Sequence, residues 1–432
     1  MVTFDQALDI AVDAVSQCFP GVDWNGVRLI RDMHGRLFVV LPDGLASDTT
    51  RLERLNELLV ERLQHYAGAI TPAAGFAETL TGTDLLSEPY IIHYRGTHAV
   101  PVIERRAVGE QWLWEPTHSE IQHPPRFVFF SLKGGVGRST ALALWARQLC
   151  LQGKSVLVLD MDLEAPGLGA QLLEQSGKPQ YGVADWLVED LVGNPAEVLI
   201  PDMALQSPLV SAGLWVVPAF GAVTDQAPEN MLAKLARAYL DKQDVEGSQY
   251  FSQRVRRMLG GLEEHYQPDV VLIDSRAGLH ETVATTMLHL DADVLCFAVD
   301  LEVTWQGYRY LFSHLAQLAQ QGGQEEDWRD RFKMVSARTM SDTFSSFLDR
   351  SYGLWTDTLY DPSSTGLNNE FSFDMRDEAA PHYPFVIPRV DAFEAFEPCR
   401  DLKKMHEGQV SAVFGEFFAG LQSRLEADQD GN

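Results

Sequence analysis

One short segment constrains the fold of this chain more than any other: an apolar run, a glycine-rich turn and a helical pattern follow one another between residues 126 and 150. The run 127–130 is typical of a buried parallel strand, and the apolar positions after the turn recur at helical spacing. The glycines let successive backbone N–H groups point into one concavity beside the positive end of the helix. Because a phosphate-binding loop requires this context, the sequence predicts a nucleotide-binding α/β domain.

The loop itself departs from the usual phosphate-binding pattern in two ways. Arg138 replaces the lysine that normally precedes the Ser/Thr pair, and Lys133 stands at the front of the loop, after Leu132 in place of the usual first glycine. Arginine is a planar fork rather than a point charge, yet it still neutralises phosphate oxygens. Ser139 lies where a loop hydroxyl reaches Mg²⁺. The residues that we expect around a bound nucleotide are Lys133, Gly134, Gly135, Val136, Gly137, Arg138, Ser139 and Thr140.

Two further apolar runs end in acidic residues. The run 154–160 ends at Asp160, with Asp162 two positions later, and the run 268–274 ends at Asp274. In a parallel sheet the carboxyl ends of the strands meet at one edge, so these carboxylates are expected beside the loop. One acidic strand end is common by chance, whereas strand ends in this order behind such a loop indicate a nucleotide site.

With a lysine at its front, the loop resembles the deviant Walker A loop of the MinD/ParA-like ATPases, whose pattern is K-G-G-x-G-K-[ST]. It resembles more closely a variant branch that carries K-G-G-V-G-R. The resemblance implies ATP and Mg²⁺ as ligands and a homodimer in which Lys133 reaches the phosphates of the partner subunit. It also implies that Arg138 replaces the lysine that acts within its own subunit. Together with Asp162, which would position the attacking water, these residues form the implied catalytic set.

The resemblance assigns a cation site as well. Ser139, Asp160 and Asp274 match the residues at the Mg²⁺ ion, and residues 275–278 match the switch loop that senses the γ-phosphate. Carboxylate and hydroxyl oxygens are the ligands that this hard cation prefers. Asp160 and Asp274 are therefore expected at the metal, and Asp162 at the water.

The end of the site that meets the nucleotide base is implied by two later segments. The run 333–338 matches the strand whose end usually meets the base, with Arg338 near the place where the family commonly has asparagine. The run 385–388, which ends at Pro388, resembles the segment that closes the base pocket. Since short apolar strands alternate with helical patterns, we expect a doubly wound, mostly parallel sheet with the site at the carboxyl ends of its strands.

At 432 residues, the chain is long enough for two domains. The pattern of residues 1–122 predicts a small α+β domain with a docking or accessory role. A proline-rich linker at 116–125 is expected to join it to the ATPase domain, residues 123–432. Its expected elements are a capped helix from Thr3, a hairpin around His34-Gly35, a helix through 52–63 and short strands near 90–94, 100–104 and 111–114.

Two segments depart from a minimal ATPase of this kind. An insertion at about 339–383 is rich in aromatic residues, and is either a partner-binding flap or a packed helical excursion. The segment 402–425 predicts a C-terminal helix with Met405, Phe417 and Leu421 on one face. Because few basic residues flank this face, the helix is expected to pack in the core rather than to bind a membrane.

Composition narrows the classes of partner. A formal net charge of −27 opposes non-specific binding to nucleic acid, which depends on basic surface. The cluster Arg254-Val-Arg-Arg257 is therefore expected to be a solvated or ion-paired face. The cysteines lack metal-ligand spacing, the N-terminus shows no signal segment, and no apolar run is long enough to span a membrane. These features predict a cytoplasmic protein with reduced thiols.

Three functions stay open at this point. The first is a nucleotide switch that dimerises on ATP, hydrolyses it slowly and controls a protein partner or effector; by resemblance, such ATPases belong to bacterial conflict and antiviral defence systems. The second is a nucleotide-stabilised scaffold with little turnover, for which Arg138 would signal a relaxed catalytic requirement. The third is a partition-type or small-molecule-modifying ATPase of the same superfamily. Asp162 favours the first, because a scaffold needs no residue that positions water.

Overall fold

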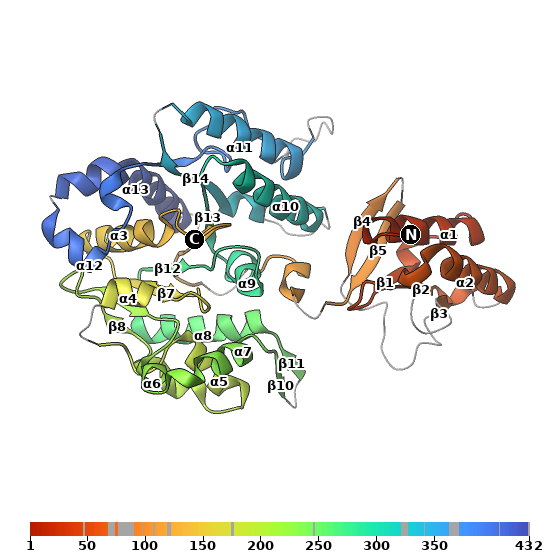
Figure 1. Cartoon of the computed structure of the whole chain (residues 1–432), viewed down its shortest axis with the longest axis horizontal. Coiled ribbons are helices and arrows are strands. Elements are labelled where there is room, and N and C mark those ends of the chain that lie inside the picture. The colour runs from red at the N-terminus through yellow and green to blue at the C-terminus, as the bar shows by residue number, and fades with distance from the viewer. Residues whose placement is uncertain are drawn as a thin grey trace. The chain divides into compact units, whose positions relative to one another are not determined.

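The computed structural model describes residues 1–45, 48–67, 74–76, 90–96, 98–106, 109–118, 122–173, 177–244, 247–320, 327–340, 342–362, 371–405 and 407–430. The chain divides into two compact units. One consists of Met1–Glu115 together with His314–Gly323, and the other of Pro116–Ser313 together with Gln324–Asn432. The glycine-rich loop belongs to the second, larger unit (Figure 1).

The first unit is a five-stranded sheet in the order β3-β2-β1-β5-β4, with two helices packed against it. The predicted hairpin is confirmed, since β1 and β2 pair in antiparallel fashion. Leu8 of the first helix and Leu55 of the second share one buried cluster with Leu29 of the sheet. The elements are α1 (Phe4–Cys18), β1 (Arg28–Arg31), β2 (Leu37–Leu41), α2 (Thr49–Leu63), β3 (Ala74–Phe76), β4 (Ile91–Arg95) and β5 (His98–Glu104).

The strand expected at residues 111–114 is wrong. Glu110–Leu113 is a short 3-10 helix, and both Gln111 and Trp112 are buried in it. Successive side chains of a strand point to opposite faces, so two consecutive buried side chains fit a tight helical turn better than a half-exposed strand.

The second unit is built on an eight-stranded sheet in the order β15-β14-β13-β6-β12-β7-β9-β8. Every pair is parallel except β8 with β9. The strands are β6 (Arg126–Ser131), β7 (Val156–Asp160), β8 (Leu205–Gln206), β9 (Leu214–Val217), β12 (Val270–Asp274), β13 (Asp293–Ala298), β14 (Phe332–Thr339) and β15 (Phe385–Pro388). Because β12 lies between β6 and β7, the strand order reverses beside β6, and the predicted doubly wound sheet is confirmed.

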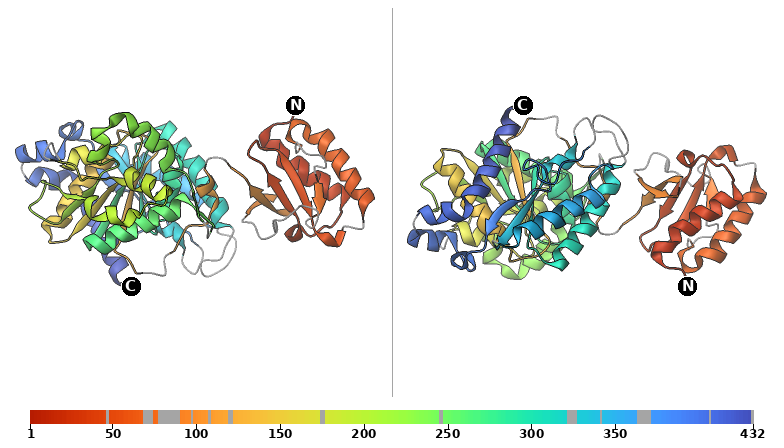
Figure 2. Two further views of the ribbon diagram at one scale, coloured as in Figure 1. Left: turned by 90° about the horizontal axis from the view of Figure 1, so that it is seen from below. Right: turned by 90° about the horizontal axis from the view of Figure 1, so that it is seen from above.

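Helices cover both faces of this sheet (Figure 2). On one face, α3 and α13 join the same buried cluster, in which the rings of Phe127 and Trp145 are 4.8 Å apart. On the other face, Tyr308 of α10 packs on Phe130 at 6.1 Å. The helices are α3 (Arg138–Leu151), α4 (Leu168–Leu173), α5 (Val183–Leu191), α6 (Ala222–Gln226), α7 (Met231–Ala238), α8 (Phe251–Tyr266), α9 (Glu281–Leu288), α10 (Glu302–Ala319), α11 (Phe344–Thr358), α12 (Pro398–Asp401) and α13 (Glu407–Asp430).

The C-terminal helix packs in the core, as the sequence predicts. Phe417 and Leu421 of α13 are both 0% exposed. No helix among the described residues combines the length and the apolar character needed to cross a membrane.

The described part of the insertion is a packed helical excursion. Helix α11 buries Trp355, and Tyr360 follows it within an aromatic cluster. Lys333 of β14 is buried and donates hydrogen bonds to the three carbonyl groups of residues 378–380, which fastens the end of the insertion to the sheet. Residues 363–370 of the insertion lie outside the described residues.

A buried ion cluster holds the helices on one side of the sheet together. Asp190, at the end of α5, accepts hydrogen bonds from Arg254 (2.7 Å), Lys242 (3.1 Å) and Arg257. Arg254 is 0% exposed, so Arg254 and Arg257 of the basic cluster on α8 are ion-paired, as one of the two sequence expectations has it. Burial acts to raise the pKa of Asp190, but the hydrogen bonds from Arg254 and Lys242 hold it below its usual value.

Replacing Asp190 is expected to destabilise the protein strongly. Asp190→Asn would leave the buried guanidinium of Arg254 without its carboxylate, and breaking such a pair costs about 3–5 kcal/mol. Urea unfolding measures this loss in the free energy of unfolding. Glu229→Gln, at an exposed acid, is the matched control. A loss below about 1 kcal/mol for Asp190→Asn would show that the cluster is not a stabilising contact.

Candidate functional site

The glycine-rich loop joins β6 to α3 at the carboxyl edge of the sheet. Gly135 (φ 77°) and Gly137 (φ 92°) adopt left-handed backbone conformations, which glycine enters without a steric cost. A Cβ atom at either position would meet no other atom, so the requirement for glycine there comes from the backbone and leaves open space in front of it. Lys133, at the front of the loop, is exposed. The geometry is that of an anion-binding loop at a helix N-terminus.

Arg138, the first residue of α3, turns away from solvent into a group of acids. Its Nε donates to Oδ1 of Asp274 at 2.6 Å, and its guanidinium lies 3.6 Å from Asp162. Ser139 donates its hydroxyl to the other oxygen of Asp274 at 2.7 Å. The structure therefore brings together residues that the sequence analysis predicted at one site. Arg138 and Ser139 both bond to Asp274, and Asp162 lies beside Arg138.

Asp160 is the most deeply buried acid of the group, with no exposed surface. Its carboxylate accepts backbone N–H groups of Asp162 (3.2 Å) and Leu168 (3.1 Å). Burial, and next the charge of Asp274, raise its pKa to about 7. The two strands place Asp160 and Asp274 directly opposite each other in register, which explains their mutual repulsion.

The acids and Ser139 are chemically suited to a magnesium ion. Mg²⁺ is usually held by one or two carboxylates together with substrate phosphates. Within the described residues there is no group of three or more acids, histidines or cysteines that could hold a metal ion without such a substrate. Asp274 and Ser139 would hold the ion beside the loop, and the ion would supply charge neutralisation for the phosphates.

A second group of side chains links the two loops that carry these acids, and the sequence analysis did not identify it. Glu164, after β7, forms an ion pair with Arg276, after β12, and accepts a hydrogen bond from Tyr239 at 3.4 Å. His280 Nδ1 accepts the N–H of Thr282, and its Nε2 lies 3.4 Å from Oε1 of Glu164. The charge of Arg276 also acts to lower the pKa of Asp162, which burial raises.

The Nη1 atom of Arg276 is buried and has no hydrogen-bond partner within the described parts of the chain. A donor in this state, beside Asp162 and the phosphate loop, is available to a ligand oxygen. The arginine within residues 275–278 was the only sequence signal for this group, and its partners come from distant segments.

The residues expected at the base lie beside the loop. Arg338 and Pro388 line a cavity of about 40 Å³ together with Gly137 and Thr140. Arg338 has a left-handed backbone (φ 56°) at the bulge where β14 and β15 change register, a conformation that is costly for a residue other than glycine. A cavity of this size holds little more than a water molecule, so entry of a base requires these side chains to move.

No family model and no curated protein matches the chain. Among solved structures it is similar to a ParA family ATPase from Chlorobium tepidum TLS, with 17% identity over 68% of this chain and 98% of that one, and a TM-score of 0.43. It is also similar to the cell division ATPase MinD of Pyrococcus furiosus, with 16% identity over 69% and 98% of the two chains and a TM-score of 0.41. A third similar structure is pNOB8 ParA bound to nonspecific DNA, with 18% identity over 71% of this chain and 99% of that one, and a TM-score of 0.43. These solved structures are ParA and MinD ATPases, the family that the loop resembles, and a likeness at this level carries no activity to this chain.

The raised pKa of Asp160 predicts a pH dependence of stability. Its pKa is about 7 in the folded protein and near 3.9 in an unfolded chain. Between these pH values Asp160 holds a proton in the folded state that it has released in the unfolded state. Protonated Asp160 therefore contributes stability that is complete below about pH 4 and is lost as the pH rises to about 7. A difference of about three pKa units limits this contribution to the free energy of unfolding to about 4 kcal/mol.

Urea unfolding of the nucleotide-free protein at pH 5 and pH 8 checks this dependence. Other carboxylates contribute their own slopes, so the informative quantity is the difference between the parent and Asp160→Asn. The variant should lose less stability than the parent between the two pH values. Equal losses in both proteins would show that Asp160 is not the group that titrates.

Proposed function

We propose that this chain is an ATP-dependent switch, which binds ATP and Mg²⁺ at the loop between β6 and α3, dimerises and hydrolyses the nucleotide slowly. The observation that carries the proposal is the position of Arg138 and Ser139 at the start of α3, both bonded to Asp274. Asp274 engages the guanidinium that phosphate oxygens would require, and the oxygens of Asp274 and Ser139 are the ligands that Mg²⁺ would require. Binding would transfer Arg138 to phosphate oxygens and Asp274 to the cation.

The chemistry of hydrolysis would then rest on positioning and charge stabilisation. Asp162, whose carboxylate lies 3.6 Å from the guanidinium of Arg138, would orient the attacking water. Arg276 would present its unpartnered Nη1 atom to the same region. Lys133, by contrast, would act on the phosphates of the partner subunit across a dimer interface, because it stands exposed at the front of the loop and away from these acids.

Exposed apolar side chains support a dimer face at this edge of the sheet. Leu279, Leu301 and Met340 are 48%, 55% and 51% exposed, and they follow the carboxyl ends of β12, β13 and β14. They therefore lie at the same edge as the loop after β6. A dimer face at this edge would remove these apolar side chains from water. The controlled partner would be a second protein or effector, by resemblance in a bacterial conflict system.

A nucleotide-stabilised scaffold is the second candidate. It is favoured by the two carboxylates that hold Arg138, because an arginine fastened by Asp274 and Asp162 would have to break two contacts before it could act on a phosphate. Retention of bound ATP with no phosphate release, at any protein concentration, would favour this candidate over the switch.

Arg138→Ala is expected to weaken ATP binding by at least about tenfold, which corresponds to about 1.4 kcal/mol. The reason is the loss of a charge-assisted contact to the phosphates. Isothermal titration calorimetry with ATP and Mg²⁺ measures the affinity. Arg237→Ala, at an exposed arginine of α7, is the control for loss of charge. Unchanged affinity in Arg138→Ala would remove this residue from the phosphate site.

The dimer is tested by mixing two inactive variants, Lys133→Ala and Asp162→Ala. If Lys133 acts on the partner's site and Asp162 on its own, a mixed dimer contains one site with both groups and one with neither. We expect each mixed dimer to recover up to about half of the parental phosphate release. Steady-state release, with mixed dimers confirmed by mass photometry of differently tagged chains, measures the recovery. No recovery in proven mixed dimers would contradict action of Lys133 in trans.

A further inference from the structure

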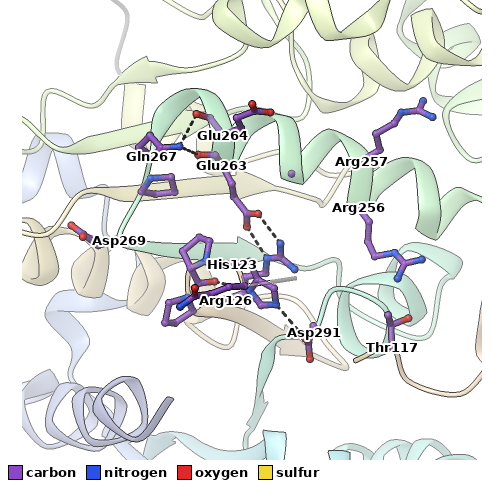
Figure 3. A pocket seen from close by; sticks show the side chains of 15 residues that line it. Thr117, His123, Arg126, Arg256, Arg257, Glu263, Glu264, Gln267, Asp269 and Asp291 are labelled. Carbon is purple, nitrogen blue, oxygen red and sulfur yellow. Dashed lines mark hydrogen bonds and ion pairs between the residues drawn. The ribbon is translucent and has the colours of Figure 1, made fainter. Parts of the chain in front are cut away.

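A second cavity, whose lining side chains Figure 3 shows, lies in the larger unit. It lies at the edge of the sheet where β6 begins, opposite the edge that carries the phosphate loop. It has a volume of about 900 Å³ and is lined by the C-terminal half of α8, the segment before β6 and the turn before β13. Arg126 starts β6 at this edge, and the loop follows the other end of the same strand. The strand separates the two by about 20 Å, so the cavity is distinct from the proposed nucleotide site.

Most of the charged groups in its wall are already compensated. Arg126 donates two hydrogen bonds to Glu263, both at 2.7 Å, and a third to the carbonyl of Leu290 at 2.8 Å. Asp291 is paired with His123 at 3.2 Å and with Arg331. These groups build a polar wall and balance one another's charges. Two further acids line the cavity without an ion pair among the described residues, Glu264 and Asp269, of which Asp269 accepts the N–H of Ser155.

Arg256 is the arginine of this wall that lacks such a partner. It is half-buried on α8, and it forms no hydrogen bond or ion pair with any residue that the structure describes. Burial, and next the positive charge of Arg126, lower its pKa, and no acid acts in the opposite direction. Figure 3 shows its guanidinium extending toward Thr117, whereas the neighbouring Arg257 points away.

Acidic residues are plentiful in this chain, as the pairs of the neighbouring Arg257 show, so a shortage of acids does not explain why Arg256 has no partner among the described residues. Arg257 pairs with Asp190 and Glu197, and the chain as a whole has 61 acidic against 34 basic residues. A half-buried arginine without an acid beside it carries an uncompensated desolvation cost, which an anion would offset. Perturbed charges of this kind in a cavity mark binding sites.

We propose that this cavity binds a small anionic ligand, whose phosphate or carboxylate group pairs with the guanidinium of Arg256. The planar fork of arginine matches either group through two parallel hydrogen bonds. The volume lies within the range of about 300–1,000 Å³ that small-molecule sites occupy. The inference stands independently of the proposed ATPase activity, because none of its residues belongs to the loop.

Calorimetry on the full chain tests the proposal with two probes, pyrophosphate for the phosphate group and citrate for the carboxylate group. Arg256→Gln should weaken the binding of at least one probe by about tenfold or more. The probe that binds identifies the group, and binding of both assigns the site to anions of either kind. Absence of binding for both probes would overturn the proposal.

A second variant tests the same site without touching the charge. Gly260 lines the cavity on α8, and a Cβ atom there would meet no other atom. Gly260→Leu should fill part of the cavity and weaken binding, while Gly260→Ala should bind nearly as the parent does. Both substitutions replace glycine within a helix, so loss of folding is not the expected cause.

Arg138→Ala separates this cavity from the phosphate loop. Binding at the cavity should survive in Arg138→Ala and be weakened in Arg256→Gln and Gly260→Leu. The opposite pattern, in which Arg138→Ala loses the probe and Arg256→Gln keeps it, would place the anion at the loop and refute the cavity site.

Discussion

The ion pair between Arg138 and Asp274 is the contact on which the rest of the candidate site depends. It joins the first residue of α3 to the last residue of β12, and Ser139 bonds to the same carboxylate. Both charged groups are buried, so each is stable only while something compensates it. In the proposed function, a nucleotide that takes Arg138 would therefore have to arrive with a cation for Asp274. Phosphate and metal binding would be coupled in this way by the charge balance of the site.

The same edge of the sheet concentrates negative charge where an anionic ligand is proposed to bind. Strand pairing sets Asp160 opposite Asp274, and the repulsion between them adds to the effect of burial on Asp160. A divalent cation resolves this conflict, because it is attracted by the acids and by the phosphates alike. The pair of Glu164 and Arg276 ties the two acidic loops to each other. A change at one loop is therefore expected to move the other.

Neighbouring residues of one helix show how strongly the surroundings decide the role of a charge. Arg254 is enclosed and bonded to Asp190, and Arg257 reaches the same acid from the surface. Arg256 points elsewhere and finds no acid in the described chain. In the sequence these residues form one basic cluster with one expected role. The helix distributes them over different directions, since successive residues are about 100° apart around its axis.

The sequence by itself determined the loop, the acidic strand ends and the α/β class, because glycine spacing and runs of apolar residues are local signals. Only the tertiary structure decided the contacts between these parts. Arg138 and Asp274 are 136 positions apart, and they meet because β12 inserts between β6 and β7. The partners of Arg276, and the lack of one for Arg256, depend on the same packing of distant segments. Local composition sets which elements form, whereas strand order and helix packing decide which side chains face each other.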